Sequence, residues 1–110
     1  MLTGDTLFVG AVGRPDLRGA AEASARALHR NLLRLLMLPD HTEIYRTHFA
    51  GSACRNGMSG QPIPTLAFEK RFNPLLGIAA ADQFVAALTR ELPPMPANIA
   101  ATVRANQGRP

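Results

Sequence analysis

The sequence predicts an α/β fold in which a few short strands are flanked by helices. Three features of the 110-residue chain support this class. The apolar run Leu7-Phe8-Val9, closed on both sides by glycines, is too short for a helix and is typical of a buried strand. Residues 20–37 repeat apolar side chains at helical spacing. Residues 42–47, with β-branched and aromatic side chains, predict a second strand.

The predicted helix at residues 20–37 has two distinct faces. Its apolar positions recur three and four residues apart, at Ala21, Ala25, Leu28, Leu32, Leu35 and Leu36. A row of arginines occupies another face, at Arg26, Arg30 and Arg34. Like charges at this spacing indicate a solvated face more often than a phosphate-binding one. Shorter helices are expected at residues 66–72 and 80–91, before a run of prolines and a weakly patterned, partly mobile tail.

Composition excludes several classes of protein. Hydrophobic residues make up 46% of the chain and charged residues 18%, which indicates one globular domain. No apolar stretch approaches the roughly 18 residues of a membrane span, and no secretory signal is visible. The net charge of +4 is arginine-rich, which is explained by codon usage better than by nucleic-acid binding. A single cysteine fits a cytoplasmic, reducing compartment.

Few residues carry a chemical signal of their own. Asp5 lies in a Thr-Gly-Asp turn at the mouth of the first predicted strand, where it could form the turn or bind a metal. His48 ends the second predicted strand, before a Gly-, Ser- and Pro-rich loop at residues 49–64. His29, beside the arginine row, is expected at the surface, and His41 is expected to be exposed in a turn.

The pattern assigns no catalytic residue. Arg55 follows Cys54 and could lower the pKa of its thiol, but no general base is assured there. The sequence contains no Ser-His-Asp order, no phosphate-binding loop and no dinucleotide fingerprint.

Four segments in order resemble the metallo-β-lactamase superfamily, in its persulfide dioxygenase and glyoxalase II (hydroxyacylglutathione hydrolase) branch. They are TGDTLFVGAVGRPDL (3–17), LPDHTEIYRTHFAGSAC (38–54), PTLAFEKRFNPLL (64–76) and FVAALTRELPPMP (84–96). The GRPDL and HFAGSAC runs are more similar to persulfide dioxygenases than to glyoxalase II. The resemblance implies that residues 1–96 form the C-terminal half of an αββα sandwich and that residues 97–110 form a tail.

The resemblance also implies roles for individual residues. Asp5 matches the acidic metal ligand, and His48 matches the histidine on the later strand, which binds the second metal in the dinuclear zinc relatives and lines the pocket in the mononuclear iron branch. Arg14 matches a Gly-Arg motif that shapes the pocket for a glutathione-linked substrate, and Asp16 is expected to tie the loop together through Arg14 or through backbone groups. The metal of the intact family is iron or zinc.

One absence limits these expectations. The family's His-x-His-x-Asp-His motif does not occur in these 110 residues. Zinc or iron typically takes three or four protein ligands, so we expect this chain alone to hold no metal stably and to be inactive, as a truncated protein. A complementary N-terminal half or self-association would complete it. The alternatives are a non-catalytic binding module that uses an exposed sheet face and, less favoured, nucleic-acid binding through the arginine row.

Overall fold

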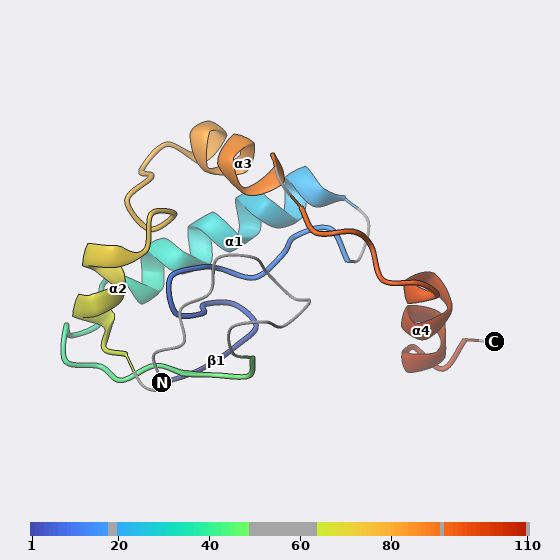
Figure 1. Cartoon of the computed structure of the whole chain (residues 1–110), viewed down its shortest axis with the longest axis horizontal. Coiled ribbons are helices and arrows are strands. Elements are labelled where there is room, and N and C mark those ends of the chain that lie inside the picture. Colours follow the sequence, from blue (N-terminus) through green and yellow to red (C-terminus); the bar gives the residue numbers. More distant parts are fainter. Residues whose placement is uncertain (18–19, 49–63, 91, 110) are drawn as a thin grey trace.

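A computed structural model describes residues 1–17, 20–48, 64–90 and 92–109. This part of the chain is mixed α/β, as predicted, with helices beside a small parallel sheet (Figure 1). Its elements in order are β1 (Leu2–Gly4), α1 (Ala21–Leu35), β2 (Tyr45–Arg46), α2 (Leu66–Phe72), α3 (Ala81–Thr89) and α4 (Ile99–Asn106).

The two strands lie side by side although about 40 residues separate them in the sequence. They pair in parallel, with Leu2 opposite Tyr45 and Gly4 opposite Arg46. The Tyr45 N–H donates to the Met1 carbonyl at 2.8 Å. The strand predicted at residues 42–47 is therefore confirmed at residues 45–46 only, toward its carboxyl end. Because the strands are parallel, their carboxyl ends meet at the same edge of the sheet.

The strand predicted at Leu7-Phe8-Val9 is wrong, although all three side chains are fully buried. The chain instead turns back at Gly10, whose φ is +77°, and Leu7 bridges Val12 in an antiparallel sense. We call residues 6–13 the glycine loop. Such a tight reversal leaves too few residues for a ladder, so burial alone gave the strand-like pattern.

The core forms between the predicted apolar face of α1 and its neighbours. Ala25 and Leu32 of α1 are buried, and they join Phe84 and Leu88 of α3 in one hydrophobic cluster. The remaining buried members come from the loops and from α2: Leu7, Val12, Ile44 and Leu66. The stripe read from the sequence is thus the side of α1 that faces the core.

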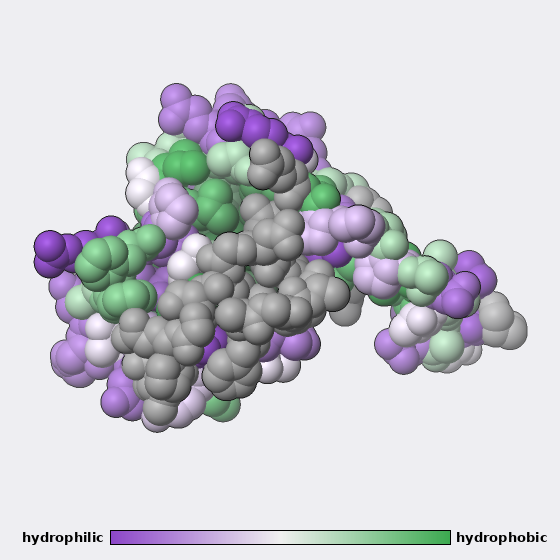
Figure 2. Space-filling model, in the orientation of Figure 1, coloured by the Kyte–Doolittle hydropathy of each residue, from purple (hydrophilic) through white to green (hydrophobic). Residues whose placement is uncertain are grey.

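The sequence predicted the last three helices with different success. The bounds of α2 match the prediction, and the Thr65 hydroxyl caps its start by accepting the Phe68 N–H at 3.3 Å. The helix expected at residues 80–91 is observed as α3, from Ala81 to Thr89, and the last predicted residue, 91, lies outside the described residues. α4 was not predicted. It buries no residue and extends away from the other elements (Figures 1 and 2), so no apolar stripe marks it.

None of the helices in the described ranges is both long enough and apolar enough to cross a membrane.

Candidate functional site

Asp5 and His48 lie in contact at the carboxyl end of the two-stranded sheet. Asp5 follows β1 directly, whereas the sequence had placed it before a strand. His48 lies two residues after β2. The Nδ1 atom of His48 is 2.6 Å from Oδ1 of Asp5. Residues 43 positions apart are therefore brought together by the parallel pairing of their strands.

The geometry of this pair defines the chemistry of the imidazole. When Nδ1 donates its proton to the carboxylate, the neutral ring carries its lone pair on Nε2, which is the form that binds metals. Both side chains are open to solvent, with 54% of Asp5 and 37% of His48 exposed. The Phe8 and His48 rings form a T-shaped pair, with centroids 6.3 Å apart and planes inclined at 75°. The pair is thus both oriented and accessible.

The guanidinium of Arg14 is held tightly by its own loop and by the segment after α3. Its Nε and Nη2 atoms donate to the two carboxylate oxygens of Asp16 at 2.8 and 2.7 Å. Nη2 also donates to the Pro93 carbonyl at 2.8 Å, and Nη1 donates to that of Pro94 at 3.3 Å. The predicted Arg14–Asp16 tie is confirmed. Only 2% of the Arg14 side chain is exposed, so this guanidinium anchors the chain.

Arg14 and Asp5 nevertheless border the same hollow. Its volume is about 340 Å³, and its walls also include Gly13 and Leu28. The structure shows Arg14 forming part of one wall of a space beside Asp5. The substrate-binding role predicted for Arg14 stays a prediction.

A second polar cluster lies behind the glycine loop, and the sequence analysis missed it. The Glu69 carboxylate, fully buried on α2, accepts the Gly10 N–H at 3.0 and 3.3 Å. The Asn73 amide donates to Glu69 at 2.8 Å and to the Ala11 carbonyl at 3.1 Å. Burial raises the pKa of Glu69, against the opposing effects of these hydrogen bonds and of Arg46. The four-residue spacing of Glu69 and Asn73, at and just past the end of α2, indicates that the two side chains lie close together, but it gives no sign of the contact with Gly10.

The donor set of the site fits a metal in kind but not in number. A carboxylate oxygen and an imidazole nitrogen are ligands that zinc and iron accept. Within residues 1–17, 20–48, 64–90 and 92–109, no group of three or more His, Cys, Asp or Glu side chains could hold an ion. Asp5 and His48 would supply at most two ligands, and further donors would have to come from other residues.

The prediction for His29 is wrong, and the prediction of a solvated arginine row agrees with the structure. His29 is buried, with 5% exposed, because Nε2 lies 3.0 Å from the Ile78 carbonyl and the ring packs on Phe84. It was predicted at the surface, since a lone histidine beside charges carries no sign of burial. His41 is exposed, as predicted.

Arg26 of the row binds Glu22 and Asp82, at 3.1 and 2.6 Å. The hydrogen bond to Asp82, followed by the one to Glu22, raises the pKa of Arg26. Arg30 and Arg34 are exposed, as a solvated face predicts.

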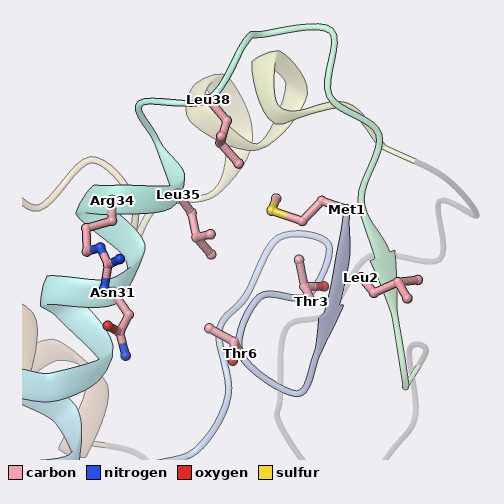
Figure 3. A pocket seen from close by; sticks show the side chains of 8 residues that line it. All are labelled: Met1, Leu2, Thr3, Thr6, Asn31, Arg34, Leu35 and Leu38. Carbon is pink, nitrogen blue, oxygen red and sulfur yellow. The ribbon is translucent and has the colours of Figure 1, made fainter.

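An open groove of about 510 Å³ separates β1 from the carboxyl end of α1 (Figure 3). Met1 and Thr6 line it from one side, and Leu35 and Leu38 line it from the other. Leu2 is 88% exposed, as is Met37 to a similar extent just beyond α1. Large apolar side chains are thus uncovered at this end of the sheet. Cys54 and most of the predicted loop after His48 lie outside the described residues.

Comparison with known proteins gives the fold a context. No family model matches the chain. A metallo-β-lactamase from Staphylococcus aureus superposes on 96% of the chain with a TM-score of 0.86 and 32% sequence identity. ETHE1 from Myxococcus xanthus superposes on 96% with a TM-score of 0.69 and 31% identity. An uncharacterized protein from Mycobacterium leprae is 39% identical over 77 residues.

The chain spans less than half of the length of each of these proteins. It covers 30% of the S. aureus enzyme, 43% of ETHE1 and 28% of the M. leprae protein. The structure therefore resembles part of a metallo-β-lactamase fold. These relatives support the family likeness seen in the sequence, and they leave the choice of branch open.

Proposed function

We propose that this chain is the C-terminal half of a metallo-β-lactamase-type domain and contributes Asp5 and His48 to its metal site. The observation that carries the proposal is the 2.6 Å contact between these residues at the carboxyl ends of adjacent parallel strands. Likeness to two solved structures, a metallo-β-lactamase and ETHE1, supports the same assignment. The remaining ligands would come from polypeptide outside these 110 residues.

The reaction that we favour is metal-dependent chemistry on a glutathione-linked thiol derivative, of the persulfide dioxygenase type or, second, the thioester hydrolase type. Bound iron or zinc would supply the electrophilic centre. This chain would hold one edge of the site and, through the wall that contains Arg14, shape the hollow beside Asp5. With only two donors assigned, the chain by itself is proposed to be inactive, in a cytoplasmic setting.

The groove beside β1 is the place where we expect the complementary N-terminal half to dock. The described part of the chain has a two-stranded sheet, so each strand leaves one edge unpaired. More than half of each solved relative has no counterpart in this chain. The exposed Leu2 and the groove-lining Met1 and Leu38 lie where such a segment would add to the sheet.

Metal titration of the 110-residue chain tests the first part of this proposal. Zn²⁺ followed by NMR should shift the signals of Asp5 and His48 first and should bind weakly. His48→Gln should abolish these shifts, whereas His41→Gln, at an exposed histidine, should not. Tight stoichiometric binding by the isolated chain, or first shifts at other residues, would contradict the proposal.

A chimera tests the whole function. This chain would replace the matching 43% of Myxococcus xanthus ETHE1, and the metal content of the purified protein would be measured. We expect one ion per site and a loss of at least about tenfold in affinity on Asp5→Asn, because a ligand carboxylate is removed. A folded chimera with equal affinity before and after Asp5→Asn would refute the role of Asp5.

A non-catalytic binding or self-associating module is the second candidate, and the uncovered apolar end of the sheet favours it. Sedimentation of the isolated chain separates the two. A dimer that Leu38→Glu dissociates would support the self-associating module. A monomer would count against self-association and would leave the groove free for the complementary half of the first proposal.

A further inference from the structure

Glu69 is a fully buried carboxylate that neither the metal site nor the substrate hollow uses. Its exposed fraction is 0%, and its partners are a backbone N–H and a side-chain amide. A buried carboxylate is costly unless hydrogen bonds compensate for its lost hydration. A sealed acid of this kind therefore has a structural or a positioning role.

The contacts of Glu69 fasten the tip of the glycine loop to α2. Gly10, at the tip, donates its N–H to the carboxylate, and its φ of +77° is a conformation that side-chain-bearing residues rarely adopt. Asn73 binds the next residue, Ala11, through its carbonyl at 3.1 Å. The Phe8 N–H also donates to that carbonyl, at 3.0 Å. The tip is thus held from two sides.

The same loop also packs against both members of the candidate site, at two different places. At Gly13 the backbone packs so closely on Asp5 that an added Cβ would lie 1.9 Å from the Asp5 carbonyl oxygen. Nearer the tip, the buried Phe8 ring lies in a T-shaped arrangement with the His48 ring. A shift of the loop would therefore move the supports of Asp5 and His48 together.

We propose that Glu69 is a positioning residue that sets the geometry of the Asp5–His48 pair by holding the glycine loop through Gly10. Glu69 acts through the loop and touches neither member of the pair. The relevance of this role to metal binding rests on the proposed function, whereas the mechanical link can be measured without a metal.

NMR spectroscopy of Glu69→Gln in the 110-residue chain tests the link. The new amide keeps one acceptor oxygen, which can take the place of the Oε2 atom that Gly10 and Asn73 share, while its NH₂ group replaces Oε1 at 3.3 Å from the Gly10 nitrogen and the negative charge is lost. We expect the Gly10 amide proton to exchange about tenfold faster, since one buried hydrogen bond is weakened. Contacts between the Phe8 and His48 rings should weaken, and the His48 ring signals should shift. Glu22→Gln, on the exposed surface of α1, is the matched control and should change none of these.

A double-mutant cycle separates positioning from general loosening. Phe8→Leu removes the ring that faces His48 and leaves the carboxylate on Gly10. In that background, Glu69→Gln should still speed Gly10 exchange but should no longer shift His48. If Glu69→Gln does not fold, Asn73→Ser, which keeps the carboxylate, should displace His48 in the same direction by less.

A folded Glu69→Gln protein with unchanged His48 signals and Phe8–His48 contacts would overturn the proposal, as would an unchanged His48 in a folded Asn73→Ser. Neither readout involves a metal. An ETHE1 chimera that binds no metal would therefore refute the proposed function and leave this link standing.

Discussion

The glycine loop separates two acidic clusters that differ in one property, their access to water. On one side, the Glu69 carboxylate is fully buried, and its hydrogen bonds end on the loop. On the other side, Asp5 is about half exposed and pairs with His48. The buried Glu69 carboxylate can stabilise the backbone but cannot contact a ligand. The exposed Asp5 carboxylate can contact a ligand and contributes less to stability. The comparison predicts that mutations on the two sides will affect stability and binding unequally.

Gly13→Ala should have the largest effect, because it breaks the base of the loop beneath the open cluster. A Cβ at Gly13 would overlap the Asp5 backbone, which cannot rotate away as a side chain could. We expect a loss of about 3 kcal/mol or more in the free energy of unfolding, measured by urea denaturation. Gly77→Ala is the matched control, since its Cβ would make an ordinary 3.6 Å contact with the Pro74 carbonyl. Equal stability of the two variants would show that the contact at Gly13 relaxes freely.

Glu69→Ala and Asp5→Ala compare the two acids directly. Removal of Glu69 leaves the Gly10 N–H and the Asn73 amide without their buried acceptor, which should cost about 2–3 kcal/mol. Removal of Asp5 breaks an exposed pair, which should cost about 1 kcal/mol or less. Urea denaturation measures both. A larger loss at Asp5 would contradict the division into a sealed and an open side.

Arg14→Lys should have an intermediate effect, at the anchor between the loop and the segment before α4. Lysine keeps the charge but cannot pair with both Asp16 oxygens while it binds the Pro93 carbonyl. We expect a loss of about 1–2 kcal/mol and faster proteolysis within residues 92–98. Arg104→Lys, on α4, is the control. Unchanged proteolysis would mean that other contacts hold this segment.

The smallest expected effect is on the pH dependence of the free energy of unfolding, which should differ between the wild type and a variant that lacks the buried Glu69 carboxylate. Because burial raises the pKa of Glu69, the folded state holds its proton more tightly than the unfolded state. The contribution of Glu69 is therefore complete below its ordinary pKa of 4.5 and is lost as the pH rises through the raised value. In that window the stability of the wild type should fall relative to Glu69→Gln, by at most about 1.4 kcal/mol per pH unit. Parallel pH profiles would contradict the raised pKa.

The helices of the core could be predicted from the sequence because the pattern that indicates a helix involves only neighbouring residues. The apolar stripe of α1 identifies that helix from nearby residues alone, and α2 is a short local element whose bounds match the prediction. The glycine loop was read as a strand because burial of Leu7, Phe8 and Val9 looks the same in a strand and in a packed loop. α4 buries nothing, so its sequence carries no periodic pattern.

The residues of the candidate site also differ in whether a local sequence signal reveals them. Asp5 and His48 were found because each stands beside a strand and resembles a family position, and the structure brings them into contact. Their metal-binding role stays a prediction. Glu69 was missed because its importance depends on Gly10, 59 residues away in the sequence, and no local pattern reports such a contact. His29 was misplaced for the same reason, since its partner Ile78 lies 49 residues away.

The parallel pairing of β1 with β2 also has a consequence for the order in which the molecule assembles. The chain between them must first close a long excursion through α1, and that closure is entropically unfavourable and slow compared with helix formation. We therefore expect residues 5 and 48 to meet after α1 has formed. A fluorophore and quencher at the two positions would follow their approach during refolding as a phase slower than helix formation.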